Sequence, residues 1–259
     1  MVAGLSSFAF FAVGEAALGS EEAFKPVVSM WFATFALAPG CFLPLEQELG
    51  RALAARRALG QGGRPVVMKV LTLGAILACV ITVVLLIGSP WLSSDYFGGN
   101  WVMVVALMIA ITAYAPTHLA RGICSGSGRF QSYAIVLGAD GLIRVLLCVA
   151  LAVVGVSSVG AFGLAVAVAP LAGVAIVAWR RDLRTEPGPE ASWQEVTPNL
   201  GWLLLGSLMA ASLVNAGPIA TNLLAAENEE AFVTRFGQGV ILARIPLFLF
   251  QAVQAALLP

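Results

Sequence analysis

Two oppositely charged residues lie in the middle of a long apolar segment, where an isolated charge would be costly. The segment covers residues 130–149 and contains Asp140 and Arg144. Residues four apart lie on one face of an α-helix, about 6 Å apart along its axis, so these two side chains can form an ion pair. Each charge would cost about 3 kcal/mol at the centre of a membrane-spanning helix. We therefore expect both side chains to face inward and to line a polar cavity within a helical bundle.

Arg144 is the first candidate for contact with an anionic ligand. Its guanidinium is always charged, and its planar fork matches the oxygens of a phosphate group. Alternatively, Asp140 simply neutralises Arg144 in a structural ion pair, because charges within membranes commonly pair with one another. The sequence leaves both interpretations open, and they can coexist if a ligand competes with Asp140 for the cation.

Arg244 is the second cation predicted near the middle of a membrane span. It lies two residues before Pro246 and has no acidic residue within one helical turn. The lack of a local partner favours a role facing the cavity more than it does for Arg144.

The only histidine, His118, follows Pro116 and precedes Arg121 near the end of an apolar segment. A lone histidine in such a place is more often a hydrogen-bonded residue than a proton relay, and we retain it as a ligand-binding candidate. Glu15, near the end of the first apolar segment, could bind a coupling cation or be protonated, or could reach the membrane interface. Asn215 and Asn222 share a helix face, and we expect them to form hydrogen bonds between helices.

No catalytic residue, metal site or cofactor is predicted, apart from a coupling ion, H⁺ or Na⁺, that the sequence does not identify. The four cysteines show no CxxC spacing and are typical of small residues in membrane helices. The glycine-rich segment 121–129 matches neither GxGxxG after a strand nor a P-loop, so a flexible turn anchored by two arginines is the simpler interpretation.

The composition indicates an integral membrane protein. Hydrophobic residues make up 59% of the 259 residues and charged residues 11%, and the mean hydropathy is +0.92. Apolar runs of about 20 residues, the length that crosses a bilayer, recur through the chain. We predict an all-α bundle with about eight membrane spans, at residues 3–19, 25–44, 66–88, 101–120, 131–155, 159–179, 199–223 and 236–258. The small residues of the sixth span predict close packing against neighbouring helices.

The charges between these spans are distributed asymmetrically. Ten of the fourteen basic residues fall on one side: Arg51, Arg56, Arg57, Arg64, Lys69, Arg121, Arg129, Arg180, Arg181 and Arg184. The other side has two basic residues against six acidic ones: Lys25 and Arg235, with Glu21, Glu22, Asp95, Glu227, Glu229 and Glu230. By the positive-inside rule the basic side is cytoplasmic, which predicts a cytoplasmic N-terminus and a multi-pass protein of the cell membrane, plasma or inner.

A short internal repeat suggests a duplicated architecture. Glu21-Glu-Ala-Phe24 recurs as Glu229-Glu-Ala-Phe232, each time just after an apolar span on the acidic side. If spans seven and eight repeat spans one and two, the repeating unit contains six helices, as in many transporters. We therefore expect a six-helix lobe at 1–180, a cytoplasmic connector at 181–198, and the first two helices of a second lobe at 199–259. On this scheme four helices of the second lobe are missing.

Within the connector, Ser192-Trp-Gln-Glu195 has capping-box spacing, and Pro198 is expected at the first position of the next helix.

Several stretches resemble polysaccharide flippases of the multidrug/oligosaccharidyl-lipid/polysaccharide superfamily. They are Leu18-Gly-Ser-Glu-Glu-Ala-Phe24, Pro39-Gly-Cys-Phe-Leu-Pro-Leu-Glu-Gln-Glu-Leu-Gly-Arg51, Arg121-Gly-Ile-Cys-Ser-Gly-Ser-Gly-Arg-Phe130, and the segment from Arg244 to Pro259. The resemblance implies a two-lobed bundle that moves a polyprenyl-pyrophosphate-linked oligosaccharide from the cytoplasmic to the outer leaflet for cell-surface polysaccharide synthesis. The partners would be this lipid, membrane lipids and polysaccharide assembly enzymes, with no nucleic acid. The chain is shorter than such transporters.

The leading hypothesis is thus a flippase that works by alternating access with a cationic central cavity. We do not expect an enzyme. An exporter of cationic drugs from the same superfamily would need acidic residues in the cavity. A membrane-embedded glycosyltransferase would need paired carboxylates or an acidic metal-binding motif at a membrane face. A nonfunctional or regulatory fragment is the remaining alternative.

Overall fold

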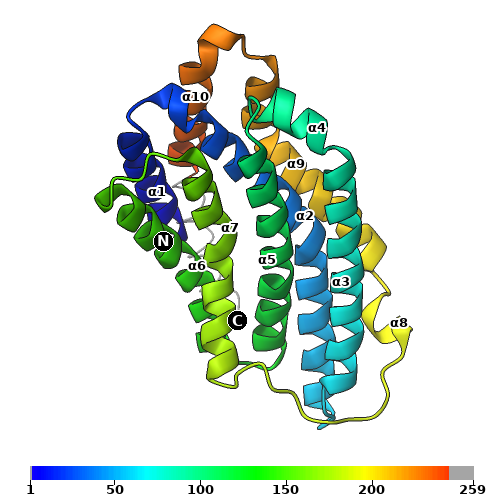
Figure 1. Ribbon diagram of the computed structural model, residues 1–259. Helices are drawn as coiled ribbons and strands as arrows, with labels where there is room; N and C mark the ends of the chain where they lie inside the picture. Colours follow the sequence, from blue (N-terminus) through cyan, green and yellow to red (C-terminus); the bar gives the residue numbers. More distant parts are fainter. Residues whose placement is uncertain (1, 245–259) are drawn as a thin grey trace.

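The computed structural model describes residues 2–244, and within them every regular element is a helix (Figure 1). Each long helix overlaps a predicted span, although residues 245–258 of the predicted span 236–258 lie outside the described residues. The elements are α1 (Val2–Leu18), α2 (Glu21–Ala58), α3 (Arg64–Ile87), α4 (Ser89–Trp91), the π-helical turn η1 (Leu92–Tyr96), α5 (Trp101–Gly126), α6 (Phe130–Val153), α7 (Val159–Trp179), α8 (Trp193–Val196), α9 (Leu200–Leu224), the 3₁₀ turn η2 (Glu227–Glu229) and α10 (Glu230–Ala243).

Six helical segments of the described chain are long and apolar enough to cross a membrane, which points to a membrane protein. They contain α2, α3, α5, α6, α7 and α9. Helix α1 is shorter, with 17 residues, and α10 has 14. The all-α class is therefore confirmed, whereas the count of eight spans and the division into two lobes stay predictions.

Helices α2 and α5 extend beyond the predicted spans, because both continue past their apolar runs. Helix α2 has 38 residues and contains Pro26, Pro39 and Pro44, and it ends 14 residues after the predicted limit at 44. Helix α5 ends at Gly126. The prediction of a flexible turn over 121–129 is thus wrong for 121–126, and only the last few residues before α6 form the turn.

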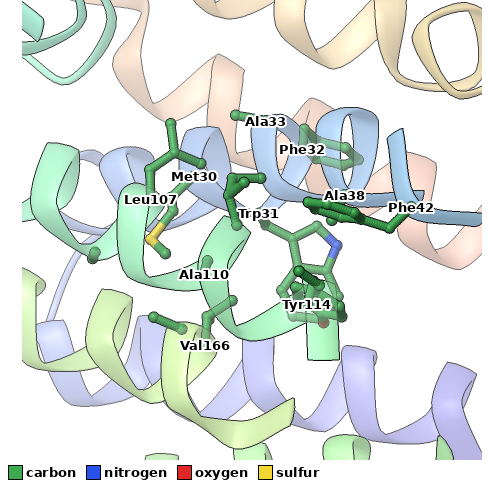
Figure 2. Packing of buried hydrophobic residues seen from close by; sticks show 14 of the residues in the cluster. Met30, Trp31, Phe32, Ala33, Ala38, Phe42, Leu107, Ala110, Tyr114 and Val166 are labelled. Atoms are coloured by element: carbon green, nitrogen blue, oxygen red, sulfur yellow. The ribbon is translucent and has the colours of Figure 1, made fainter. Parts of the chain in front are cut away.

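Helix α2 lies at the centre of the bundle and packs against α5 along much of its length (Figure 1). Large side chains of α2 meet residues of α5 and α7 in one apolar core, as Figure 2 shows for Met30, Trp31 and Phe42 of α2, Leu107, Ala110 and Tyr114 of α5, and Val166 of α7. This core positions the polar residues that follow on the same helices.

The connector between α7 and α8 is anchored to the ends of α2 and α3, and Arg56 is the centre of this anchor. Its guanidinium donates to both carboxylate oxygens of Glu195, at 2.6 and 3.0 Å, and to the backbone carbonyls of Gly62, Pro189 and Glu190. The N-cap half of the predicted capping box is confirmed, since the Ser192 hydroxyl accepts a hydrogen bond from the Glu195 N–H and α8 begins at the next residue, Trp193. The Glu195 carboxylate binds Arg56 instead of completing the box. Pro198 precedes α9 instead of occupying its first position, because α9 begins at Leu200.

The charged segments gather at the two ends of the bundle as the sequence predicts. The basic segments contact one another: Arg129 donates to the carbonyl of Arg184 at 3.0 Å, and the Arg64 N–H donates to the carbonyl of Glu186 at 3.0 Å. We call this the basic end; the connector runs along it at the bottom of Figure 1. The opposite end, where α10 meets the start of α2, is called the acidic end. Which end faces the cytoplasm stays a prediction.

Helix α7 packs closely on its neighbours, which confirms the role predicted for its small residues. A Cβ atom on Gly160 would lie 2.4 Å from a methyl carbon of Val102 on α5. On Gly173 it would lie 2.7 Å from the carbonyl oxygen of Val136 and 2.8 Å from its Cα, both backbone atoms of α6. The close contact between α6 and α7 therefore requires glycine at position 173, because a side chain there would meet the backbone of α6.

The substitution Gly173→Ala is expected to lower the free energy of unfolding by about 1–3 kcal/mol, because the new methyl group meets backbone that cannot move aside. The matched control is Gly206→Ala on α9, where a Cβ atom meets nothing within 4 Å; alanine there is expected to leave stability unchanged or raise it slightly. Thermal unfolding of both variants in detergent measures the difference. Equal melting temperatures would contradict the close packing of α6 and α7.

Candidate functional site

Asp140 and Arg144 form an ion pair on α6, as their spacing predicts, and a third residue completes it. Arg144 Nη2 donates to Asp140 Oδ1 and, at 3.0 Å, to the hydroxyl of Tyr114 on α5. The Tyr114 hydroxyl donates in turn to Asp140 Oδ2 at 3.1 Å. The charge of Arg144 is therefore neutralised within the protein, and the pair ties α6 to α5.

Aromatic rings of α2 enclose the guanidinium of Arg144. Its central carbon lies 4.8 Å from the ring centre of Trp31 and 5.5 Å from that of Phe35, distances at which a cation is attracted to a ring face. Arg144 is 3% exposed, and its Nε has no hydrogen-bond partner among the described residues. One donor of a deeply buried cation is thus unused.

His118 belongs to a second polar cluster, one turn further along α5. Its Nδ1 lies 2.8 Å from Glu46 Oε2 on α2, and the rest of that carboxylate is occupied as well. Glu46 Oε1 lies 3.1 Å from Arg121 Nη2 and accepts a hydrogen bond of 3.2 Å from the Tyr133 hydroxyl. Glu46 and His118 are 6% and 2% exposed. This cluster joins α2, α5 and α6 and occupies His118 at one ring nitrogen.

The two clusters form a continuous polar column along one face of α5. Tyr114, His118 and Arg121 are spaced by four and three residues, which places them on the same side of a helix, and the rings of Tyr114 and His118 are 6.2 Å apart. The column consists of Asp140, Arg144, Tyr114, His118, Glu46, Arg121 and Tyr133. At the basic end, Glu46 and Tyr133 line a hollow of about 400 Å³, so the column reaches the surface there.

Sequence reasoning missed Glu46, Tyr114 and Tyr133. Glu46 lies beyond the predicted span 25–44, because the apolar run stops there, whereas α2 continues to Ala58. The spacing of Tyr114, His118 and Arg121 was a usable signal, since three polar side chains on one face of a predicted membrane helix indicate inward-facing neighbours.

Arg244 lies apart from the polar column, at the end of α10. Its guanidinium donates to the carbonyl of Val214 at 2.5 Å, lies 3.4 and 3.5 Å from Asn215 Oδ1, and stands 5.5 Å from the ring centre of Phe32. All these contacts are with uncharged groups. Within the described residues Arg244 therefore has no carboxylate partner, as its sequence context predicts.

The two central arginines contact adjacent faces of the same turn of α2. Arg144 lies against Trp31 and Phe35, whereas Arg244 lies against Phe32, which is about 100° from Trp31 and about 60° from Phe35 around the helix. The structure therefore brings Asp140 and Arg144 together, places His118 nearby through Tyr114, and keeps Arg244 outside that group.

The predicted interhelical roles of the two asparagines are confirmed. Asn215 donates to the carbonyl of Phe35 at 3.3 Å, and Asn222 donates to the carbonyl of Tyr96 at 3.1 Å. Glu15 accepts a hydrogen bond from Gln238 of α10. Among residues 2–244 no group of three or more His, Cys, Asp or Glu could hold a metal ion.

The fold and the buried charges define a helical membrane protein with a charged column inside its bundle. A scan against protein-family models and searches of curated proteins and of solved structures found no match.

Asp140→Asn is expected to lower the free energy of unfolding by about 3 kcal/mol, because the buried guanidinium of Arg144 loses its countercharge. The double substitution Asp140→Leu with Arg144→Met removes both charges and is expected to cost less than Asp140→Asn alone. Thermal unfolding in detergent measures both, with Asp95→Asn at the exposed acidic end as the control. A double variant that is no more stable than Asp140→Asn would contradict a coupled pair.

Proposed function

We propose that this protein is a transporter that flips a polyprenyl-pyrophosphate-linked oligosaccharide from the cytoplasmic to the outer leaflet of the cell membrane. The observation that carries the proposal is the environment of Arg244. The sequence resemblance to polysaccharide flippases and the helical membrane fold support the same conclusion. The N-terminus and the basic end are assigned to the cytoplasm by the positive-inside rule.

Arg244 is a cation that lacks a countercharge in the described structure. Its side chain is part-buried where α2, α9 and α10 meet, and its contacts are the carbonyl of Val214, the amide of Asn215 and the ring of Phe32. A charge in such a place needs an anion or ample water. The forked guanidinium matches a pyrophosphate, which would supply that charge while the cargo is bound.

Arg144, Asp140 and His118 contribute to the proposal in a different way from Arg244. Asp140 and Tyr114 already satisfy Arg144, and Glu46 occupies His118. The pyrophosphate would reach Arg144 only by competing with Asp140, with the unused Nε as a further donor. Arg244 is therefore the primary contact with the cargo, and the polar column mainly holds the helices around it.

The charge inside the bundle distinguishes this cargo from a cationic drug. Exporters of cations need an uncompensated carboxylate along the path, whereas Asp140 is neutralised by Arg144 and Glu46 by Arg121. Arg244 is a cation near the middle of the bundle without a carboxylate partner in residues 2–244, whereas the carboxylate of Glu15, bound by the amide of Gln238, lies near the acidic end. An anionic cargo is thus favoured, with membrane lipids and polysaccharide assembly enzymes as its partners.

The substitution Arg244→Ala in the protein as the cell produces it is expected to slow flipping of a pyrophosphate-linked oligosaccharide lipid roughly tenfold or more, because a charge-assisted hydrogen bond is lost. Arg244→Lys keeps the charge without the fork and is expected to retain part of the rate. The measurement is the appearance of the sugar headgroup on the far side of reconstituted vesicles.

The matched control is Arg64→Ala, which removes an exposed arginine at the start of α3 and is expected to leave flipping unchanged. The same vesicles are also tested with a cationic dye. Undiminished flipping by Arg244→Ala protein would overturn the proposal, and transport of the dye without the lipid would favour the drug exporter.

A further inference from the structure

The repeated Glu-Glu-Ala-Phe segment joins α2 and α10 at the acidic end through two ion pairs. Lys25 Nζ lies 3.0 Å from Glu230 Oε1, and Arg235 Nε lies 2.6 Å from Glu21 Oε2. Each copy of the segment therefore supplies one carboxylate, and each carboxylate pairs with a cation of the other helix. The repeat that suggested duplication from sequence thus forms a reciprocal contact between its two copies.

Two further hydrogen bonds connect α10 to the first two helices. The hydroxyl of Thr234, which is 0% exposed, donates to the carbonyl of Glu21 at 2.7 Å. One turn further along α10, Gln238 donates to the carboxylate of Glu15 on α1. Glu15 and Gln238 line a hollow of about 430 Å³ between α1 and α10, so this hydrogen bond lies beside open space.

Between these polar contacts, α10 lies against α2 at a glycine. A Cβ atom on Gly237 would be 2.5 Å from a methyl carbon of Val28 and 3.0 Å from the ring of Phe32. At this point the backbone of α10 contacts side chains of α2 without a side chain of its own. The specific contacts that attach α10 to α2 are therefore mainly the polar ones at the acidic end.

We propose that the two ion pairs and two hydrogen bonds form a clasp that closes the acidic end and opens when cargo leaves on that side. This acidic-end clasp consists of Glu15, Glu21, Lys25, Glu230, Thr234, Arg235 and Gln238. The inference rests on the proposed transport function, because a transporter has to open toward the side on which it releases its cargo.

Exposure separates this clasp from the polar column. The side chains of Glu230 and Arg235 are 40% and 68% exposed, so water can replace their partners when the helices separate. Exposed ion pairs are weak and screened by salt, whereas breaking a buried pair leaves an unpaired charge inside the protein. Glu46 and His118 in the column are almost fully buried. The two ion pairs of the clasp can therefore be replaced by water more readily than the contacts of the column, whereas the Thr234 hydroxyl of the clasp is fully buried.

A cysteine at position 28 reports on the opening of the clasp without any cargo. Val28 is 1% exposed and is covered by α10, so Val28→Cys reacts with a membrane-impermeant maleimide only when α10 moves away. The four native cysteines are first replaced by serine, and the reagent is added at the acidic end of reconstituted protein. Combining Glu21→Gln with Glu230→Gln is expected to speed labelling roughly tenfold.

A charge exchange supplies the matched variant. Lys25→Glu alone places two carboxylates face to face and is expected to speed labelling, whereas Lys25→Glu with Glu230→Lys restores the pair and the slow rate. Arg180→Gln removes an exposed ion pair with Asp182 at the basic end and is expected to change nothing.

Labelling that is equally slow in the parent and the neutralised protein, or equally fast in the single and the exchanged variants, overturns the clasp. Because the reagent reports on accessibility, this result does not depend on whether the pyrophosphate-linked lipid is transported. Failure of lipid flipping with normal labelling changes would remove the proposed cargo and leave the clasp in place.

Discussion

A charge inside an apolar bundle has to find its partner within the protein, and this requirement determines how α2, α5 and α6 are held together. Glu46 of α2 is bound by His118 and Arg121 of α5 and by Tyr133 of α6. Glu46 and His118 are almost fully buried, so moving one helix away would leave several polar groups unsatisfied at once. Buried charged groups therefore link these three helices, whereas α9 packs along α2 and is linked to it by uncharged hydrogen bonds from Ser207 and Asn215.

Local features of this fold could be predicted from the sequence because their causes lie within a few residues. Asp140 and Arg144 are one helical turn apart, so their pairing follows from helix geometry alone. The cap at Ser192 depends on the residue three positions later, and it forms as expected. The apolar runs also predict the long helices, since the thickness of a bilayer sets the length of a membrane-spanning run.

The candidate site could be predicted only in part, because its contacts join distant parts of the chain. Glu46 and His118 are 72 positions apart, and no periodicity within one segment indicates that they meet. The hydropathy pattern also predicts that this span ends at residue 44, so Glu46 lies outside the predicted helix. Similarly, the position of Arg244 against Phe32 of α2 depends on how α10 crosses the bundle, which the order of the spans does not fix.

The anchoring of the connector at Arg56 limits how α9 can move. Arg56 and Glu195 attach α8 to the end of α2, so α8 stays with α2, and α9 begins only at Leu200. Any rotation of α9 relative to α2 must be absorbed by residues 197–199 or at Pro218 within the helix. The pivot then lies near the basic end, and the 25 residues of α9 make a lever of about 37 Å. A rotation of a few degrees at the connector becomes a displacement of several ångströms where α9 leads into α10.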